Sequence, residues 1–93
     1  MKWRIILAPR ARRQLDAIPS EIRLTILMDI RVLVDNPFPL SGGTKKLKGF
    51  KSPTYRLRSG NFRSIYRVEK DIVVVVSVFD RKNLDRELQS LRN

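Results

Sequence analysis

Basic side chains that could grip a phosphate alternate along two neighbouring segments of the chain. Residues 53–58 carry Arg56 and Arg58, and residues 62–68 carry Arg63 and Arg67. In an extended strand every second side chain faces the same way, so each arginine pair lies on one face. The fixed fork of a guanidinium matches two oxygens of a phosphate. The two segments therefore predict a surface that could bind a polyanion.

Charge is unevenly distributed along the sequence. The chain has 20 Lys and Arg against 9 Asp and Glu, a net charge of +11 and a pI near 11.1. No acidic residue occurs from position 36 to 68, a stretch that holds Lys45, Lys46, Lys48, Lys51, Arg56, Arg58, Arg63 and Arg67. Alternating arginines can simply form a solvated face, but such a face normally mixes charges of both signs. The excess predicts a nucleic acid, an anionic membrane surface or an acidic protein as partner.

The composition excludes several kinds of chemistry. The chain has no Cys and no His. Disulfides, thiol nucleophiles, Ser-His dyads and the usual zinc sites are therefore excluded, and proton transfer must use Asp, Glu, Lys or Tyr. We expect no metal and no cofactor. The longest apolar runs are too short to span a membrane or to form the core of a signal peptide, so we expect a cytoplasmic protein.

The elements that position these residues follow from hydrophobic periodicity. We expect residues 1–93 to form one domain, with strands at residues 3–8, 53–58, 62–68 and 72–78. Two helices are expected between Pro9 and about residue 35, separated at Pro19-Ser20, and a third over residues 80–93. The fold class is α+β: an N-terminal strand and a helical hairpin packed on a mostly antiparallel sheet, with a short C-terminal helix. The opposite face of the sheet would carry the arginines.

Several apolar positions are predicted to form the core. Five residues of the second helix make one stripe at helical spacing: Ile22, Ile26, Ile30, Leu33 and Val34. The run IVVVVSV at residues 72–78 predicts a central strand that is buried on both faces. Tyr55, Phe62 and Tyr66 alternate with the arginines, which favours core packing over base stacking.

Read in order, these motifs resemble the RelE/ParE toxin superfamily of type II toxin–antitoxin systems. The resemblance covers nearly the whole chain and is strongest over the segment LKG…YRLRSGNFRSIYRV, followed by the valine strand and Arg81-Lys82. The middle portion is most similar to the RelE branch, whose members are ribosome-dependent endoribonucleases that cut mRNA. Family resemblance thus implies a RelE-like fold, a translation-inhibiting toxin and, as partners, the ribosome, mRNA and an acidic RelB-like antitoxin.

The resemblance also implies site residues. The matching catalytic positions are Arg56, Arg58, Arg63 and Arg81, which would clamp the scissile phosphate and stabilise its charge. Arginine is a poor base because it stays protonated, so Lys51, Asp85 and Glu87 are the candidate general bases. Further RNA contacts are expected from Lys45, Lys46, Lys48, Lys51, Arg67 and Lys82.

Two other functions remain open. Several family members carry a tyrosine after the last strand that helps catalysis, whereas residues 81–87 here contain none. This departure favours a ParE-like toxin that inhibits DNA gyrase without cutting RNA. A weakly active RNA-binding homologue is the remaining alternative.

Overall fold

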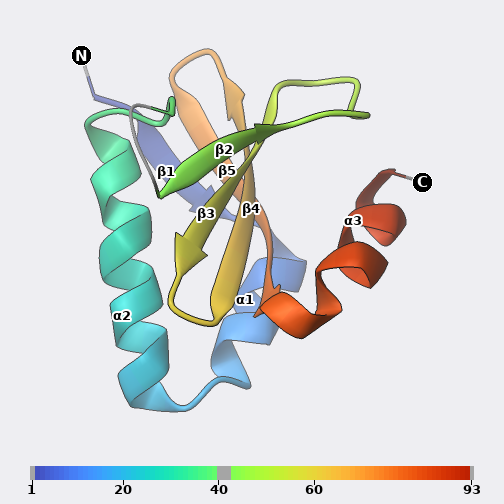
Figure 1. The fold of residues 1–93 in the computed structure, drawn as a ribbon. Coiled ribbons are helices and arrows are strands. Elements are labelled where there is room, and N and C mark those ends of the chain that lie inside the picture. Colours follow the sequence, from blue (N-terminus) through green and yellow to red (C-terminus); the bar gives the residue numbers. More distant parts are fainter. Residues whose placement is uncertain (1, 40–42, 93) are drawn as a thin grey trace.

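A five-stranded mixed sheet organises the chain, whose computed structural model describes residues 2–39 and 43–92 (Figure 1). The strands lie in the order β1-β5-β4-β3-β2. β1 runs parallel to β5, and all other neighbours are antiparallel. The strands are β1 (Arg4–Leu7), β2 (Thr44–Leu47), β3 (Thr54–Ser59), β4 (Phe62–Glu69) and β5 (Ile72–Asp80). The helices are α1 (Pro9–Asp16), α2 (Ser20–Arg31) and α3 (Leu84–Arg92), with 3-10 turns η1 (Val32–Val34) and η2 (Arg81–Asn83). The predicted α+β fold is confirmed.

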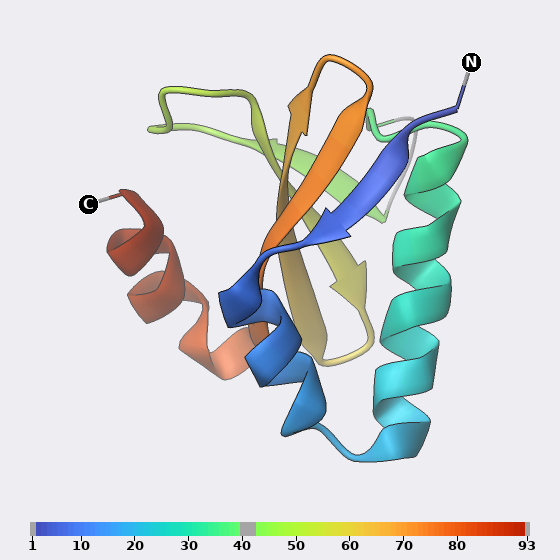
Figure 2. The ribbon, with the colours of Figure 1, turned by 180° about the vertical axis from the view of Figure 1, so that it is seen from behind.

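Helices α1 and α2 pack on one face of the sheet and run in opposite directions (Figure 2). Pro9 is the first residue of α1, where its missing N–H leaves no helical bond unmade. α1 buries Ala11 and Leu15, and α2 buries Ile26 and Ile30. These side chains meet the apolar residues of β3, β4 and β5 in the larger of two core clusters.

The predicted stripe of α2 is wrong at its first residue. Ile22 is 42% exposed, while Leu24, Met28 and Val32 on another side of the helix are 60–65% exposed. α2 is therefore apolar around most of its circumference, so periodicity alone could not decide which residues would face the sheet.

Strand β2 is absent from the sequence prediction, which placed the first strand after the helices at residue 53. Its sequence is TKKL, short and charged, and it forms the edge of the sheet beside β3. Lysines are common on edge strands because they discourage pairing with other chains. The same charges hide the strand from a search for apolar alternation. The two glycines at positions 42 and 43 predict a loop over residues 38–44, of which residues 40–42 lie outside the described residues.

Aromatic side chains fill the core as predicted. Tyr55 and Tyr66 are 5% and 0% exposed and stack with ring centroids 5.4 Å apart. The hydroxyl of Tyr66 donates a hydrogen bond of 2.6 Å to the carbonyl of Pro37. Burial raises the pKa of Tyr66, and the neighbouring Tyr55 raises it further.

The valine strand is less buried than predicted. Val73, Val75 and Val78 are fully buried, but Val74 and Val76 are only half-buried. The buried valines face the helical hairpin in the larger core cluster, whereas Val76 only borders the smaller cluster beside α3, which covers its face of the sheet less completely.

Helix α3 lies on the other face of the sheet. Its Leu88 packs with Ile65 of β4 and Phe79 of β5 in a second apolar cluster. The described helices are all too short or too polar to cross a membrane.

Candidate functional site

Strand register places the predicted arginines on one face. Arg58 of β3 pairs with Arg63 of β4, and Arg56 pairs with Ile65. Residues directly opposite one another in an antiparallel pair project from the same side of the sheet. Because Ile65 contacts α3, the arginine face is the face on which α3 packs.

Arg81 reaches this group from the far end of β5. Phe62 at the start of β4 pairs with Asp80 at the end of β5, and the Arg81 amide donates a 2.8 Å hydrogen bond to the carbonyl of Asn61. The turn between β3 and β4 and the first residue after β5 therefore lie together. Arg81 itself begins the 3-10 turn η2 and is exposed.

The four guanidinium groups also act on one another electrostatically. Partial burial lowers the pKa of Arg63, and the positive charges of Arg56, Arg58 and Arg81 lower it further. Asp80 acts in the opposite direction. We call Arg56, Arg58, Arg63 and Arg81 the arginine cluster. Like charges gathered in this way destabilise the fold and attract an anion.

Among the described residues, the arginine cluster forms no ion pair with a carboxylate. Nη1 of Arg63 donates bonds of 2.9 Å to the carbonyls of Gly60 and Phe62. Nε of Arg56 is buried without a hydrogen-bond partner among the described residues. Across residues 2–39 and 43–92, the ion pairs formed by carboxylates involve other basic residues. A buried donor without a partner is uncommon in proteins and can be satisfied by an oxygen of water or of a ligand.

The other predicted basic residues are spread more widely. Lys45 pairs with Arg56 and shares its face, but Lys46 pairs with Tyr55 and projects from the opposite face. Lys48 and Lys51 lie in the loop between β2 and β3, and Lys82 is exposed in η2. Arg67 lies at the other end of β4 from Arg63, where its Nε is 3.2 Å from the carboxylate of Glu69.

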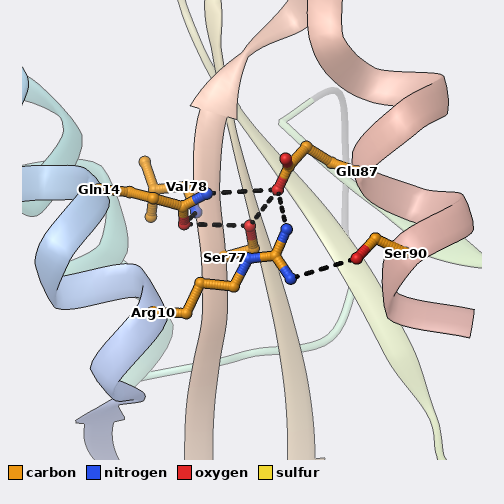
Figure 3. Close-up of polar contacts among 6 residues, drawn as sticks. All are labelled: Arg10, Gln14, Ser77, Val78, Glu87 and Ser90. Atoms are coloured by element: carbon orange, nitrogen blue, oxygen red, sulfur yellow. Dashed lines mark hydrogen bonds and ion pairs between the residues drawn. The ribbon is translucent and has the colours of Figure 1, made fainter. Parts of the chain in front are cut away.

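Glu87 does not reach the arginine cluster. Its Oε1 accepts hydrogen bonds from Arg10 (2.7 Å), Gln14 (3.2 Å) and Ser77 (3.0 Å), as Figure 3 shows. Its side chain is 13% exposed and lies in the seam between α1 and α3. The interpretation of Glu87 as a general base is therefore corrected: the carboxylate ties α3 to α1.

The polar seam also covers an open sheet edge. β1 ends before the last residues of β5, and the amide of Val78 donates to Oε1 of Gln14 at 2.7 Å instead (Figure 3). The hydroxyl oxygen of Ser77 also lies 3.1 Å from Oε1 of Gln14, so its single proton is shared between Gln14 and Glu87. Gln14 of α1 thus supplies the hydrogen-bond acceptor for this amide of β5, and α1 is joined to α3 through Glu87. Sequence reasoning missed this role of Arg10 and Gln14, since their partners lie more than 60 residues away.

Of the other candidate bases, Asp85 is the one nearest in sequence to the arginine cluster. It is exposed in the first turn of α3 and follows Arg81 by four residues, about one helical turn. Lys51 lies in a different groove, together with Arg67. Among the described residues, no three carboxylates gather in a way that could hold a metal ion.

The sequence matches the model of a known family. A family model described as "ParE toxin of type II toxin-antitoxin system, parDE" matches residues 5–84. The chain belongs to this toxin family. Curated proteins give no significant match to its sequence.

Solved structures similar to this toxin include RelE proteins. A chain of the archaeal RelE–RelB complex from Pyrococcus horikoshii OT3 has 24% identity and a TM-score of 0.74, covering 87% of this toxin and 97% of that chain. A chain of the RelB–RelE antitoxin–toxin complex from Methanococcus jannaschii has 26% identity and a TM-score of 0.70, covering 88% and 96%. A mutant of E. coli toxin RelE in the free state has 22% identity and a TM-score of 0.74, covering 97% and 93%.

Proposed function

We propose that this toxin is an endoribonuclease that cuts mRNA on the ribosome and so inhibits translation. The observation that carries the proposal is the arginine cluster, in which three separate segments bring four guanidinium groups together without a paired carboxylate. The RelE-type fold of the similar structures supports it. A concentrated positive charge beside a scissile phosphate stabilises the negative charge that develops on it.

The reaction would be an internal transesterification of RNA. The 2′-oxygen attacks the neighbouring phosphorus, a P–O bond to the 2′-oxygen forms, and the bond to the leaving 5′-oxygen breaks. The 2′-hydroxyl proton passes to a base, for which the exposed Asp85 carboxylate is our candidate. The leaving 5′-oxygen takes up a proton from water. Arg56, Arg58, Arg63 and Arg81 hold the phosphate in line and stabilise its charge.

Cleavage of ribosome-bound mRNA in single turnover tests the proposal. Arg58→Gln and Arg81→Ala should each lower the rate by about 10²–10³-fold, the usual cost of removing one group that stabilises a transition-state charge. Arg12→Ala removes an equal charge from the exposed surface of α1 and should keep the wild-type rate. Thermal unfolding of each variant shows whether it is folded. Wild-type rates in both cluster variants would refute the proposal.

A second candidate function is inhibition of DNA gyrase. The family model that matches the chain is the ParE model, and residues 81–87 contain no tyrosine. The two functions leave different traces in cells. Inducible expression followed by mapping of transcript 5′ ends should show new mRNA ends if the toxin cuts RNA. Supercoiling defects with intact transcripts would select gyrase inhibition.

We also propose an acidic antitoxin as partner. Two of the similar structures are complexes of RelE with RelB, and a +11 protein suits an acidic segment that folds as it binds. Leu24 and Met28 of α2, with Val32 at the start of η1, expose an apolar strip that such a segment would cover. Co-expression of the acidic protein encoded beside the toxin gene should restore growth. The triple substitution of these residues by serine should abolish the rescue while cleavage persists.

A further inference from the structure

A second basic groove lies on the arginine face, away from the arginine cluster. It has a volume of about 420 Å³ and runs between the loop that joins β2 to β3 and the C-terminal end of α3. Figure 1 shows this loop reaching toward α3. Lys51, Arg67 and Arg92 supply its positive charge, and Phe50 and Leu91 supply an apolar floor.

Arg92 is held in a defined position. Its guanidinium lies 5.2 Å from the ring centroid of Phe50, and its Nη2 donates a 3.1 Å hydrogen bond to the carbonyl of Lys48. Gly49 has φ +88°, and a Cβ there would lie 3.0 Å from Nε of Arg92. Glycine is needed here both for the backbone conformation and for the close approach of the arginine.

The guanidinium of Arg67 is only weakly paired with a carboxylate. Its Nε lies 3.2 Å from a carboxylate oxygen of Glu69, but the two do not form a well-aligned hydrogen bond. The side chains are 41% and 51% exposed. Such exposed pairs contribute little energy, so an incoming phosphate can compete for the guanidinium.

The groove lines up with the arginine cluster. Arg63 and Arg67 are four residues apart on β4 and share one face, which places them about 13 Å apart along the strand. A few nucleotides of extended RNA span such a distance. Beneath the groove, a smaller cavity of about 90 Å³ continues its apolar floor to Ile65 and Val76.

We propose that this groove is a second RNA subsite, which binds the phosphate and base of a nucleotide a few positions from the cleaved linkage. The proposal rests on the proposed RNA-cutting function. Basic groups that follow a backbone, beside an apolar floor with an aromatic ring, are the features of single-strand binding sites. An acidic protein segment would satisfy the same charges, but the alignment with the arginine cluster along β4 favours one continuous RNA strand.

Binding of 2′-O-methyl RNA tests the subsite without cleavage, because this RNA lacks the attacking hydroxyl. The probes are single strands of about three and about eight nucleotides, titrated at several salt concentrations. The variant is Lys51→Ala with Arg67→Gln. The matched control is Arg12→Ala with Arg13→Ala, which removes the same charge from the exposed surface of α1.

The variant should bind the longer RNA roughly threefold to tenfold more weakly than the wild type and bind the short RNA equally well. Its slope of log affinity against log salt should fall by about 0.7 for each phosphate that the protein no longer neutralises. The control should keep the preference for the longer RNA.

Three results would overturn the subsite. Wild-type affinity and salt slope of the variant on the longer RNA would overturn the subsite alone. Loss of affinity for polyglutamate, with RNA binding intact, would assign the groove to an acidic protein. A wild-type protein that binds neither RNA would overturn the subsite, while the RNA-cutting function would fall only if ribosome-bound mRNA also stayed uncut.

Discussion

Replacing Arg58 by glutamine is expected to make the protein more stable while it weakens RNA cleavage. Arg58 stands directly opposite Arg63 across the β3–β4 pair, and its side chain is exposed. No hydrogen bond or ion pair joins its side chain to another described residue. Glutamine keeps much of the length of the side chain and removes only the charge. Arg63 would be a poorer choice, since its two bonds to backbone carbonyls would be removed as well.

The expected gain follows from the register. Like charges directly opposite in an antiparallel pair destabilise it by about 0.2–1 kcal/mol. Arg58 is also one of the charges that lower the pKa of Arg63, which shows that the two groups repel each other in the folded protein. For a domain of this size, that energy corresponds to a rise in melting temperature of about 1–8 °C.

Thermal and urea unfolding at two salt concentrations would measure the effect. The screening length falls from about 10 Å at 0.1 M salt to about 3 Å at 1 M, so the gain should shrink at high salt. Arg12→Gln on the exposed surface of α1 changes the net charge equally and is the control for general repulsion in a +11 protein. The difference between the two variants is the contribution of the arginine cluster.

An Arg58→Gln variant that is no more stable than Arg12→Gln at low salt would refute the reasoning. A gain that is independent of salt would do the same, because it would have to come from packing. A more stable variant with an RNA cleavage rate lowered by about 10²–10³-fold would show that the positive charge is kept for function at a cost in stability.

Three further predictions concern the elements that support the site. Tyr66→Phe removes the buried hydrogen bond to Pro37 and should lower the free energy of unfolding in urea by about 1–2 kcal/mol. Because the pKa of Tyr66 is raised in the folded protein, the wild type should be fully stable below pH 10 and lose at most about 1.4 kcal/mol per pH unit above it. The phenylalanine variant should not show this decline. Glu87→Gln weakens the tie between α1 and α3 and should cost about 1–3 kcal/mol, and hydrogen exchange should rise first in α3; unchanged exchange there would contradict this. Gly49→Ala forces a side chain into a left-handed backbone position against Arg92 and should cost about 1 kcal/mol or more, measured by thermal unfolding.

The sequence alone was sufficient for the local features of the arginine face. Alternation along residues 53–58 and 62–68, with a tight turn between them, determines that Arg56, Arg58 and Arg63 share one face. The same alternation placed Tyr55 and Tyr66 in the core. These are relations between near neighbours, and strand geometry fixes them wherever the strands lie.

Other features were not visible in the sequence. β2 was missed because a short, charged edge strand has no apolar alternation. The sequence suggests Glu87 as a possible base because neither its burial nor its partner Arg10, 77 residues away, can be read from its neighbours. α2 exposes Leu24 and Met28 because its apolar residues surround the helix, and only packing selects the buried side.

Arg81 marks the boundary between the two kinds of information. Its type and its place after the valine strand can be read from the sequence, and the family resemblance is the reason to count it with the other arginines. Its position beside Arg63 depends on β5 pairing with the full length of β4 and ending beside the turn between β3 and β4. That position is set by long-range strand pairing, whose energy comes from burying the core, so only the folded chain determines it.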